Sequence, residues 1–356
     1  MIKCFDPDIG EKDKKNIIDT LESKILAYGP NVEKFEKEYH KFSNKINNIS
    51  FNSASSAAFL LYRYLFEKYG PCEVYTTSLG FVSPVTAALS NGHSVTYVDV
   101  NDDLLMCVRD LQAKFKNNSE KTSIIMPVLY GGVSRVDGYE EFCKQNNALL
   151  VLDSAHCITP TIQHDFAFYS FHPVKPICMS NGGLLATDCN EAAEYMFRGR
   201  NFGRKLMGDT YDLVQFGFNF YMNNLNAALG LSQLGKCLGN VEKRRKNFIF
   251  LKNNLPSEIG YFTKHDKNSS YYLSSLVLSP GLSSAGMRQR LADNEIQTSF
   301  HYPFLHTSTH YKVDYGLDKL DSLSDRIINL PIHQNLTEKD LEKIINECIC
   351  YSRSRR

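Results

Sequence analysis

The sequence predicts an α/β protein built around a mainly parallel β-sheet. Through the first two thirds of the chain, short apolar runs of strand length alternate with stretches of helical periodicity. Several of these runs end in polar side chains, as expected where parallel strands deliver functional groups to one edge of a sheet. From about Val241 the composition becomes more polar. We therefore predict a large domain over residues 1–240 and a smaller α+β domain over residues 241–356.

The expected elements follow from periodicity, apolar runs and end signals. The expected strands are Ile46–Phe51, Glu73–Leu79, Ser94–Val100, Thr122–Tyr130, Leu149–Leu152, Phe166–Phe171, a short run after Gly183, and Tyr271–Leu278. The expected helices are Val32–Phe42, residues 57–70, Pro84–Leu89, Tyr139–Gln145, Glu191–Arg198, Asn223–Leu238, Val241–Leu255, Ala285–Asn294 and Glu338–Ser352. Residues 1–30 are polar and are expected to wrap the surface, with Asn31 capping the helix that follows.

Composition excludes several classes of protein. The net charge of +1 gives no electrostatic reason to expect a nucleic acid or an anionic membrane as partner. No apolar run is long enough to span a bilayer, and the N-terminus lacks the apolar segment of a signal peptide. The ten cysteines show no CxxC pairs and no spacing typical of metal ligands, so we expect reduced thiols, no metal and a cytoplasmic location. No GxGxxG follows a strand, which excludes a nicotinamide site.

Most of the candidate functional side chains lie between residues 149 and 187. The run at Leu149 is followed by Asp153 and His156, and the run at Phe166 by Ser170 and Lys175. Pyridoxal phosphate needs a lysine for covalent attachment, an acid for its pyridine nitrogen and donors for its phosphate. A carboxylate, a hydroxyl and an amine at one sheet edge therefore suit this cofactor.

Each of these residues also has a plainer interpretation. Taken singly, Lys175 would be a surface lysine, Asp153 a capping residue and His156 an ordinary loop histidine. The serines at 55 and 56 could bind a phosphate at a helix start or simply cap that helix. Phe81, just past a strand end, could belong to the core or stack on a flat ring. Only the combination favours the cofactor site.

The combination resembles a known family. Asp153-Ser-Ala-His156, Ser170-Phe-His-Pro-Val-Lys175 and Asn181-Gly-Gly resemble motifs of the DegT/StrS nucleotide-sugar aminotransferases. The resemblance implies the pyridoxal-phosphate fold type I, with a parallel central sheet flanked by helices and a smaller C-terminal domain. It implies that Lys175 is catalytic and carries the cofactor. The cofactor-binding residues implied are Ser55, Ser56, Phe81, Asp153, His156, Ser170, Lys175 and Asn219.

The resemblance also implies a reaction. An amino group would pass from L-glutamate, through pyridoxamine phosphate, to a keto-deoxysugar linked to a nucleotide, most simply a 4-keto-6-deoxy sugar. Asn219 would reach the active site of the neighbouring subunit in a homodimer. Substrate contacts are expected from Arg204, His301 and Tyr302. Two alternatives stay open: a pyridoxal-phosphate-dependent sugar-nucleotide dehydratase, which Lys175 argues against, and a regulatory protein that binds the cofactor without catalysis.

Overall fold

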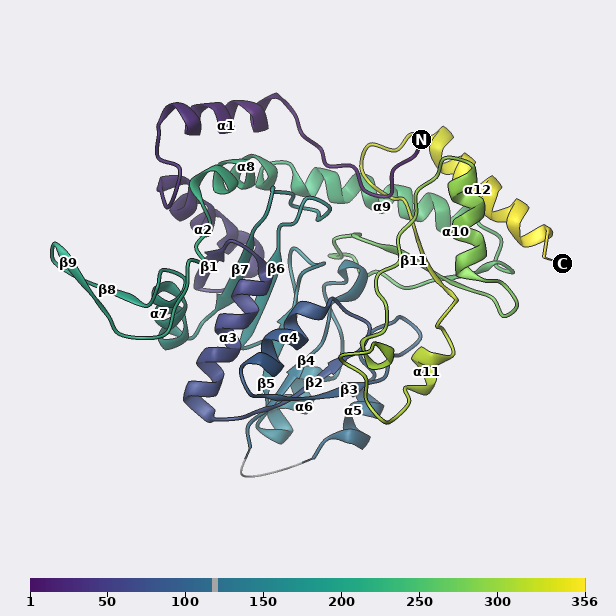
Figure 1. The fold of residues 1–356 in the computed structure, drawn as a ribbon. Helices are drawn as coiled ribbons and strands as arrows, with labels where there is room; N and C mark the ends of the chain where they lie inside the picture. Colours follow the sequence, from purple (N-terminus) through teal and green to yellow (C-terminus); the bar gives the residue numbers. More distant parts are fainter. Residues whose placement is uncertain (117–120, 356) are drawn as a thin grey trace.

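The structure is a computed structural model that describes residues 1–116 and 121–355. Its centre is a seven-stranded sheet with the strand order β1-β7-β6-β5-β4-β2-β3. Helices cover both faces of this sheet (Figure 1). The strands are β1 Asn47–Phe51, β2 Glu73–Thr77, β3 Ser94–Val98, β4 Ser123–Met126, β5 Leu149–Asp153, β6 Phe166–Ser170 and β7 Gly183–Thr187. The predicted fold class, α/β with a mainly parallel central sheet, is confirmed.

The strands from β3 to β6 run parallel, whereas β7 is antiparallel to β6 and β1 is antiparallel to β7. Alternate residues of each strand point to opposite faces, so the sheet separates two apolar cores. Helices α2, α5, α6 and α8 contribute to one core, and α3, α4 and α7 to the other. These helices are α2 Pro30–Ser43, α3 Ala54–Tyr69, α4 Val82–Ser90, α5 Val108–Lys114, α6 Tyr139–Asn146, α7 Asn190–Gly199 and α8 Asn224–Leu234.

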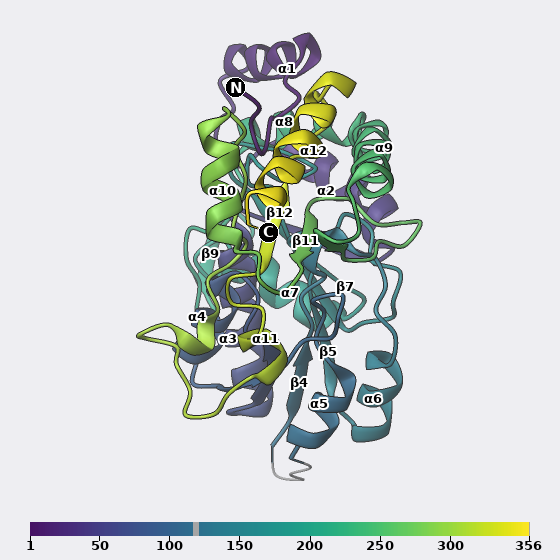
Figure 2. The same cartoon turned by 90° about the vertical axis from the view of Figure 1, so that its right-hand side faces the viewer.

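A second, antiparallel sheet has the order β10-β11-β12 and packs with helices from the C-terminal part of the chain (Figure 2). The helices and strands of this part of the chain are α9 Cys237–Asn254, β10 Gly260–Phe262, β11 Ser274–Leu278, α10 Ser284–Asp293, α11 Asp318–Asp321, β12 Ile327–Leu330 and α12 Glu338–Arg353. The N-terminal segment joins this part, because Ile2 pairs with Ile296 and the imidazole of His333 hydrogen-bonds the Lys3 carbonyl. The division at residue 240 stays a prediction.

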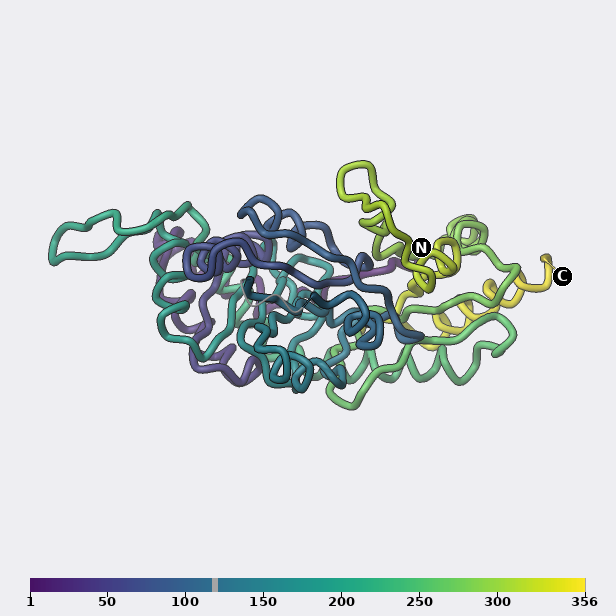
Figure 3. Tube along the Cα trace, turned by 90° about the horizontal axis from the view of Figure 1, so that it is seen from below, coloured from purple at the N-terminus to yellow at the C-terminus, as the bar shows by residue number. Residues whose placement is uncertain are grey.

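An arm extends from one end of the elongated molecule (Figure 3). It consists of two antiparallel strands, β8 Arg204–Met207 and β9 Thr210–Leu213. Its apolar side chains Leu206, Met207, Tyr211 and Leu213 are all exposed. The arm therefore lacks an apolar surface of its own chain to pack on.

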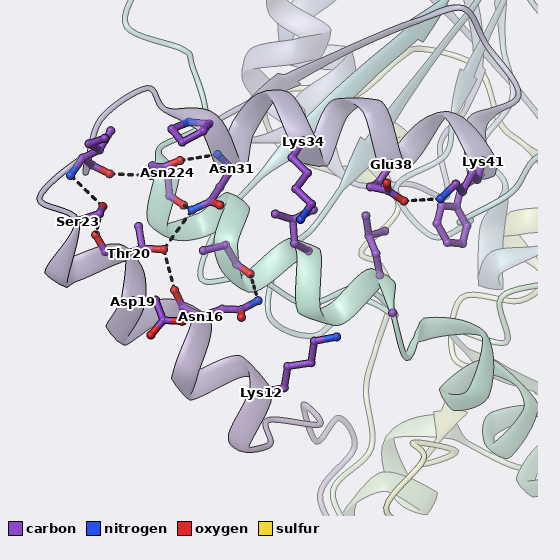
Figure 4. A pocket seen from close by; sticks show the side chains of 17 residues that line it. Lys12, Asn16, Asp19, Thr20, Ser23, Asn31, Lys34, Glu38, Lys41 and Asn224 are labelled. Carbon is purple, nitrogen blue, oxygen red and sulfur yellow. Dashed lines mark hydrogen bonds and ion pairs between the residues drawn. The ribbon is translucent and has the colours of Figure 1, made fainter.

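Residues 1–30 are mostly exposed, and they contain a helix that the sequence analysis did not predict, α1 Glu11–Glu22. Its Ile18 and Leu21 face solvent, and polar contacts fix it instead (Figure 4). Asn16 Nδ2 donates to the Ala228 carbonyl of α8, and Asn31 Nδ2 of α2 donates to Thr20 Oγ1. The helix has few apolar residues, and those at 18 and 21 are exposed, so polar contacts to other helices contribute much of what holds it in place.

The residue that caps the start of α2 differs from the predicted one. Gly29, rather than Asn31, is the N-cap of α2, and Pro30 supplies the first residue of the helix.

No helix within residues 1–116 and 121–355 is both long and apolar enough to cross a membrane.

Candidate active site

A cavity of about 250 Å³ lies at the carboxyl ends of β5 and β6. This is the sheet edge where open α/β folds bind ligands. The predicted residues that line it are Ser55, Phe81, Asp153, His156, Ser170, Lys175, His301 and Tyr302. Residues from distant parts of the sequence, within 53–55, 81–84, 153–181 and 272–302 and at Val128, thus converge on one space.

Asp153 ends β5, whose preceding residues Leu150, Val151 and Leu152 are buried. Its side chain is also buried, and the backbone N–H of Ala155 donates to Oδ1 at 3.0 Å. Burial raises the pKa of the Asp153 carboxyl to about 6. A carboxylate in this state gains from any cationic partner that enters the cavity.

Lys175 lies in the loop between β6 and β7, and its side chain is buried. This loop folds back on the sheet through hydrogen bonds from Phe171 to Gly182 and from Met179 to Phe171. Among the described residues, none forms a hydrogen bond or ion pair with the Nζ atom. Burial lowers the pKa of the Lys175 amine to about 7, so a large fraction is neutral and nucleophilic near neutral pH.

The turn before α3 offers backbone donors to an anion. Ser53 caps the helix and accepts a hydrogen bond from the Ser56 N–H at 3.1 Å. Gly183 of β7 passes so close that a Cβ there would lie 2.3 Å from the Ala54 nitrogen. The turn and β7 therefore fit together only with a glycine at position 183. The free N–H groups and the dipole of the helix start favour a phosphate at this place.

An aromatic cluster contributes to the lining of the cavity. The Gly131 N–H donates to His156 Nδ1, so Nε2 carries the proton and donates to Tyr302 Oη at 2.8 Å. Burial lowers the pKa of His156 well below its usual value, which keeps the ring neutral. Tyr130 Oη donates to the carbonyl of His301, and His301 Nε2 lies 3.2 Å from Tyr272 Oη. These contacts fix the two rings at 301 and 302 against the cavity.

Three predicted site residues lie outside the cavity. The Ser56 hydroxyl donates to Asn52 Oδ1 at 2.6 Å and supports the turn from behind. Asn219 has an exposed side chain, although its carbonyl accepts from Asn52 Nδ2. Arg204 lies on the arm, with its guanidinium between the rings of Phe202 and Tyr211. The roles assigned to these three residues stay predictions.

Tyr272, His172 and Asn181 line the cavity without having been assigned a role from the sequence. His172 and Asn181 stand inside the quoted motifs, so their position was visible in the sequence. Tyr272 stands at the start of an apolar run, where the sequence predicts that an aromatic residue belongs to the hydrophobic core. Only its place in the fold brings it to Lys175.

The donor set fits pyridoxal phosphate. A buried amine and a buried carboxyl face one cavity, a helix start offers donors for a phosphate, and Phe81 and His156 border the space between them. A flat, charged ring with a phosphate at one corner needs these groups at separate sides of one cavity.

Comparisons with known proteins agree with this chemistry. The model of the DegT/DnrJ/EryC1/StrS aminotransferase family matches residues 7–348. UDP-4-amino-4,6-dideoxy-N-acetyl-beta-L-altrosamine transaminases are similar across nearly the whole chain. The one from Campylobacter jejuni is 29% identical over 96% of this chain and 94% of its own length. The one from Helicobacter pylori is 28% identical over 97% of this chain and 96% of its own length.

Solved structures show the same fold. The Helicobacter pylori PseC aminotransferase, involved in the biosynthesis of pseudoaminic acid, superposes with a TM-score of 0.91 at 24% identity, covering 99% of each chain. A putative sugar aminotransferase from Streptococcus pneumoniae, in its PMP form, gives a TM-score of 0.90 at 22% identity over all of both chains.

Proposed function

Because the chain belongs to the DegT/DnrJ/EryC1/StrS aminotransferase family, we propose that it is a pyridoxal-phosphate-dependent aminotransferase acting on a nucleotide-linked sugar. It takes the amino group of L-glutamate and gives it to the keto group of a deoxysugar, which becomes an amino sugar. The observation that carries this proposal is the pair of buried groups, Asp153 and Lys175, on one cavity.

The residues that would hold the cofactor are divided between the sides of the cavity. Lys175 would bind it covalently, and Asp153 would pair with its pyridine nitrogen. Ser170, Ser55 and the amides of the turn before α3 would bind its phosphate, with Phe81 and His156 against the ring. When bound, the cofactor supplies an electron sink for the bond that breaks at the α-carbon of the amino acid.

Lys175 is the proton carrier of this proposal. Once free of the cofactor, the amine at Nζ would take a proton from the α-carbon of the amino acid and would give it to the cofactor. A group performs this task best when its pKa lies near the working pH. Burial gives Lys175 a pKa of about 7, which suits both halves of the transfer.

The sugar nucleotide would enter from the side of the aromatic cluster. His301 and Tyr302 would contact the sugar, and Arg204 of a neighbouring subunit would pair with the pyrophosphate. The named relatives act on a UDP-linked 4-amino-4,6-dideoxy sugar, as their names state. The substrate class that follows for this chain is a 4-keto-6-deoxy sugar nucleotide.

The functional unit would be a homodimer. An isolated two-stranded hairpin is marginally stable in water, yet the arm presents Leu206 and Leu213 with 79% and 63% of their surface exposed. A second copy of the chain would cover these side chains. The exposed side chain of Asn219 would then reach the neighbouring active site. Ten unpaired cysteines support the reducing cytoplasm as the compartment.

The test is the absorption spectrum of the purified protein with pyridoxal phosphate, before and after L-glutamate. We expect a visible band that glutamate converts to the amine form of the cofactor. Lys175→Ala should lose turnover by at least about 100-fold, because the proton carrier is gone. Lys144→Ala, an exposed lysine on α6, is the matched control and should behave as wild type.

The outcomes separate the alternatives. Conversion by glutamate, followed by amination within a panel of keto-sugar nucleotides, would establish the reaction. A band that ignores glutamate would favour the dehydratase. A protein that binds no cofactor through Lys175 would rule out the proposed reaction.

A further inference from the structure

We propose that Tyr272 is a positioning residue for Lys175, whose ring holds the Nζ amine beside the cavity whenever that amine is not bound to the cofactor. This inference rests on the proposed function and adds a residue from the C-terminal part of the chain to the site.

The geometry places the amine over the ring. The Nζ atom of Lys175 lies 4.2 Å from the centroid of the Tyr272 ring. The face of an aromatic ring carries partial negative charge and attracts an ammonium group within about 6 Å. No described residue forms a hydrogen bond with this Nζ atom, so the ring face is the contact available to the amine. Asp153, which lines the same cavity, adds an electrostatic attraction to the amine.

Tyr272 is itself held in place from several sides. Its side chain is 1% exposed, and the Phe5 ring stacks on it at 5.4 Å with 19° between the planes. Its backbone N–H donates to the Gly131 carbonyl at 3.0 Å. Because its hydroxyl faces His301 Nε2 at 3.2 Å, the ring face rather than the oxygen meets Lys175. A fixed ring is a better support for a moving amine than a flexible side chain.

The reaction explains why such support matters. The lysine must leave the cofactor, carry a proton and return in each half of the transfer. A free lysine side chain has four rotatable bonds, and each excursion away from the reacting carbon lowers the rate. A ring at 4.2 Å limits these excursions without a hydrogen bond that would tie up the amine.

The first experiment uses the protein freed of cofactor. Pyridoxal phosphate is added, its attachment to Lys175 is fixed by borohydride at timed intervals, and peptide mapping locates the modified lysine. Tyr272→Phe keeps the ring and should attach the cofactor within about twofold of the wild-type rate. Tyr272→Met removes the ring but fills space flexibly, and should slow attachment by about tenfold.

A second set of variants keeps the shape and changes only the charge of the ring face. Phenylalanine analogues with increasing numbers of ring fluorines are incorporated at position 272. Fluorine withdraws electron density from the face, so the ring stabilises the ammonium form less, and the pKa of the Lys175 amine, read from the pH dependence of attachment, should fall progressively along the series. This series does not depend on whether Tyr272→Met folds. An unchanged amine pKa along the series would overturn the inference.

A double-mutant cycle separates positioning from general support of the cavity. In a Lys175→Ala background, the non-covalent affinity for pyridoxal phosphate should change by less than about twofold on Tyr272→Phe or on fluorination. A loss of affinity in that background would mean that the ring shapes the cavity directly, and the inference would fail.

The outcomes also distinguish this inference from the proposed function. If wild-type protein does not attach the cofactor at Lys175, the proposed function fails and the inference with it. If wild type attaches it, but Tyr272→Met attaches it equally fast and the fluorinated variants keep the same amine pKa, only the inference fails. In steady state, a positioning role further predicts a fall in kcat with little change in KM for L-glutamate.

Discussion

The Oγ atom of Ser78 and the Nδ1 atom of His306 lie 2.7 Å apart and are both buried. Ser78 follows β2, and its Oγ also accepts the backbone N–H of His306 at 3.0 Å. The other ring nitrogen of His306 lies 2.9 Å from Asp321 Oδ1. This network fastens the segment that carries His301 and Tyr302 to an end of the central sheet. Ser78 is not among the described residues that line the cavity of His301 and Tyr302, so the network would act on the site through the position of this segment.

Removing the Ser78 hydroxyl should destabilise the segment that carries His301 and Tyr302. Ser78→Ala leaves two buried donor or acceptor groups of His306 unpaired, and the expected loss of stability is about 1–3 kcal/mol. Urea unfolding measures this loss, and the KM for the sugar nucleotide should rise because His301 and Tyr302 move. Ser322→Ala removes an exposed serine hydroxyl and should stay within about 0.5 kcal/mol of wild type. An unchanged Ser78→Ala would contradict the role of the network.

Gly183→Ala should impair binding of the cofactor phosphate. The added Cβ would lie 2.3 Å from the Ala54 nitrogen and the Ser53 carbonyl carbon, so the turn must move. We expect the dissociation constant for pyridoxal phosphate, measured by titration, to rise by at least about tenfold. In Gly239→Ala on α9 the new methyl group meets no atom within 4 Å, and the affinity should be unchanged. Equal affinity in both variants would place the phosphate elsewhere.

The buried amine of Lys175 should make the stability of the cofactor-free protein depend on pH. Its pKa is lowered from 10.5 to about 7 by burial, so the unfolded chain binds more protons between these values. Stability should therefore rise as the pH increases through this window and level off above it.

From about pH 7 to about pH 9 the contribution of Lys175 amounts to about 2 kcal/mol. Lys175→Met lacks the titrating group, so the difference between wild type and variant in urea unfolding isolates this contribution. Burial raises the pKa of Asp153 to about 6, so its contribution to stability falls rather than rises with increasing pH, mainly below this window. A flat difference between about pH 7 and about pH 9 would show that the amine is not buried in solution.

The arm should be required for the dimer. Leu206→Asp places a charge on a side chain that is 79% exposed in the single chain and covered in the proposed dimer. Sedimentation should show dissociation into monomers, with loss of activity in proportion. Leu238→Asp on α9, at a site 64% exposed, is the control and should remain dimeric. A dimeric Leu206→Asp would exclude the arm from the interface.

Much of the fold and the site could be predicted from the sequence. The strands β4, β5 and β6 consist mostly of apolar residues. The cofactor residues on β5, β6 and their loops lie close together in the chain. Such local patterns depend on few neighbours, so they can be read without the fold. The helix α1 was not predicted because polar contacts to residues distant in the chain hold it in place. Ser56 does not line the cavity because its hydroxyl donates a hydrogen bond to the Asn52 side chain.

The sequence by itself determined the α/β class, the family and the pair Asp153 and Lys175, because strand periodicity and motif spacing are local properties of the chain. The tertiary structure alone decided that Phe5, Lys175 and Tyr272 meet, and that Ser78 binds His306. These contacts join residues far apart in the chain, and their formation depends on how the two sheets pack. Side-chain patterns of period two or 3.6 carry no information about such distant pairs.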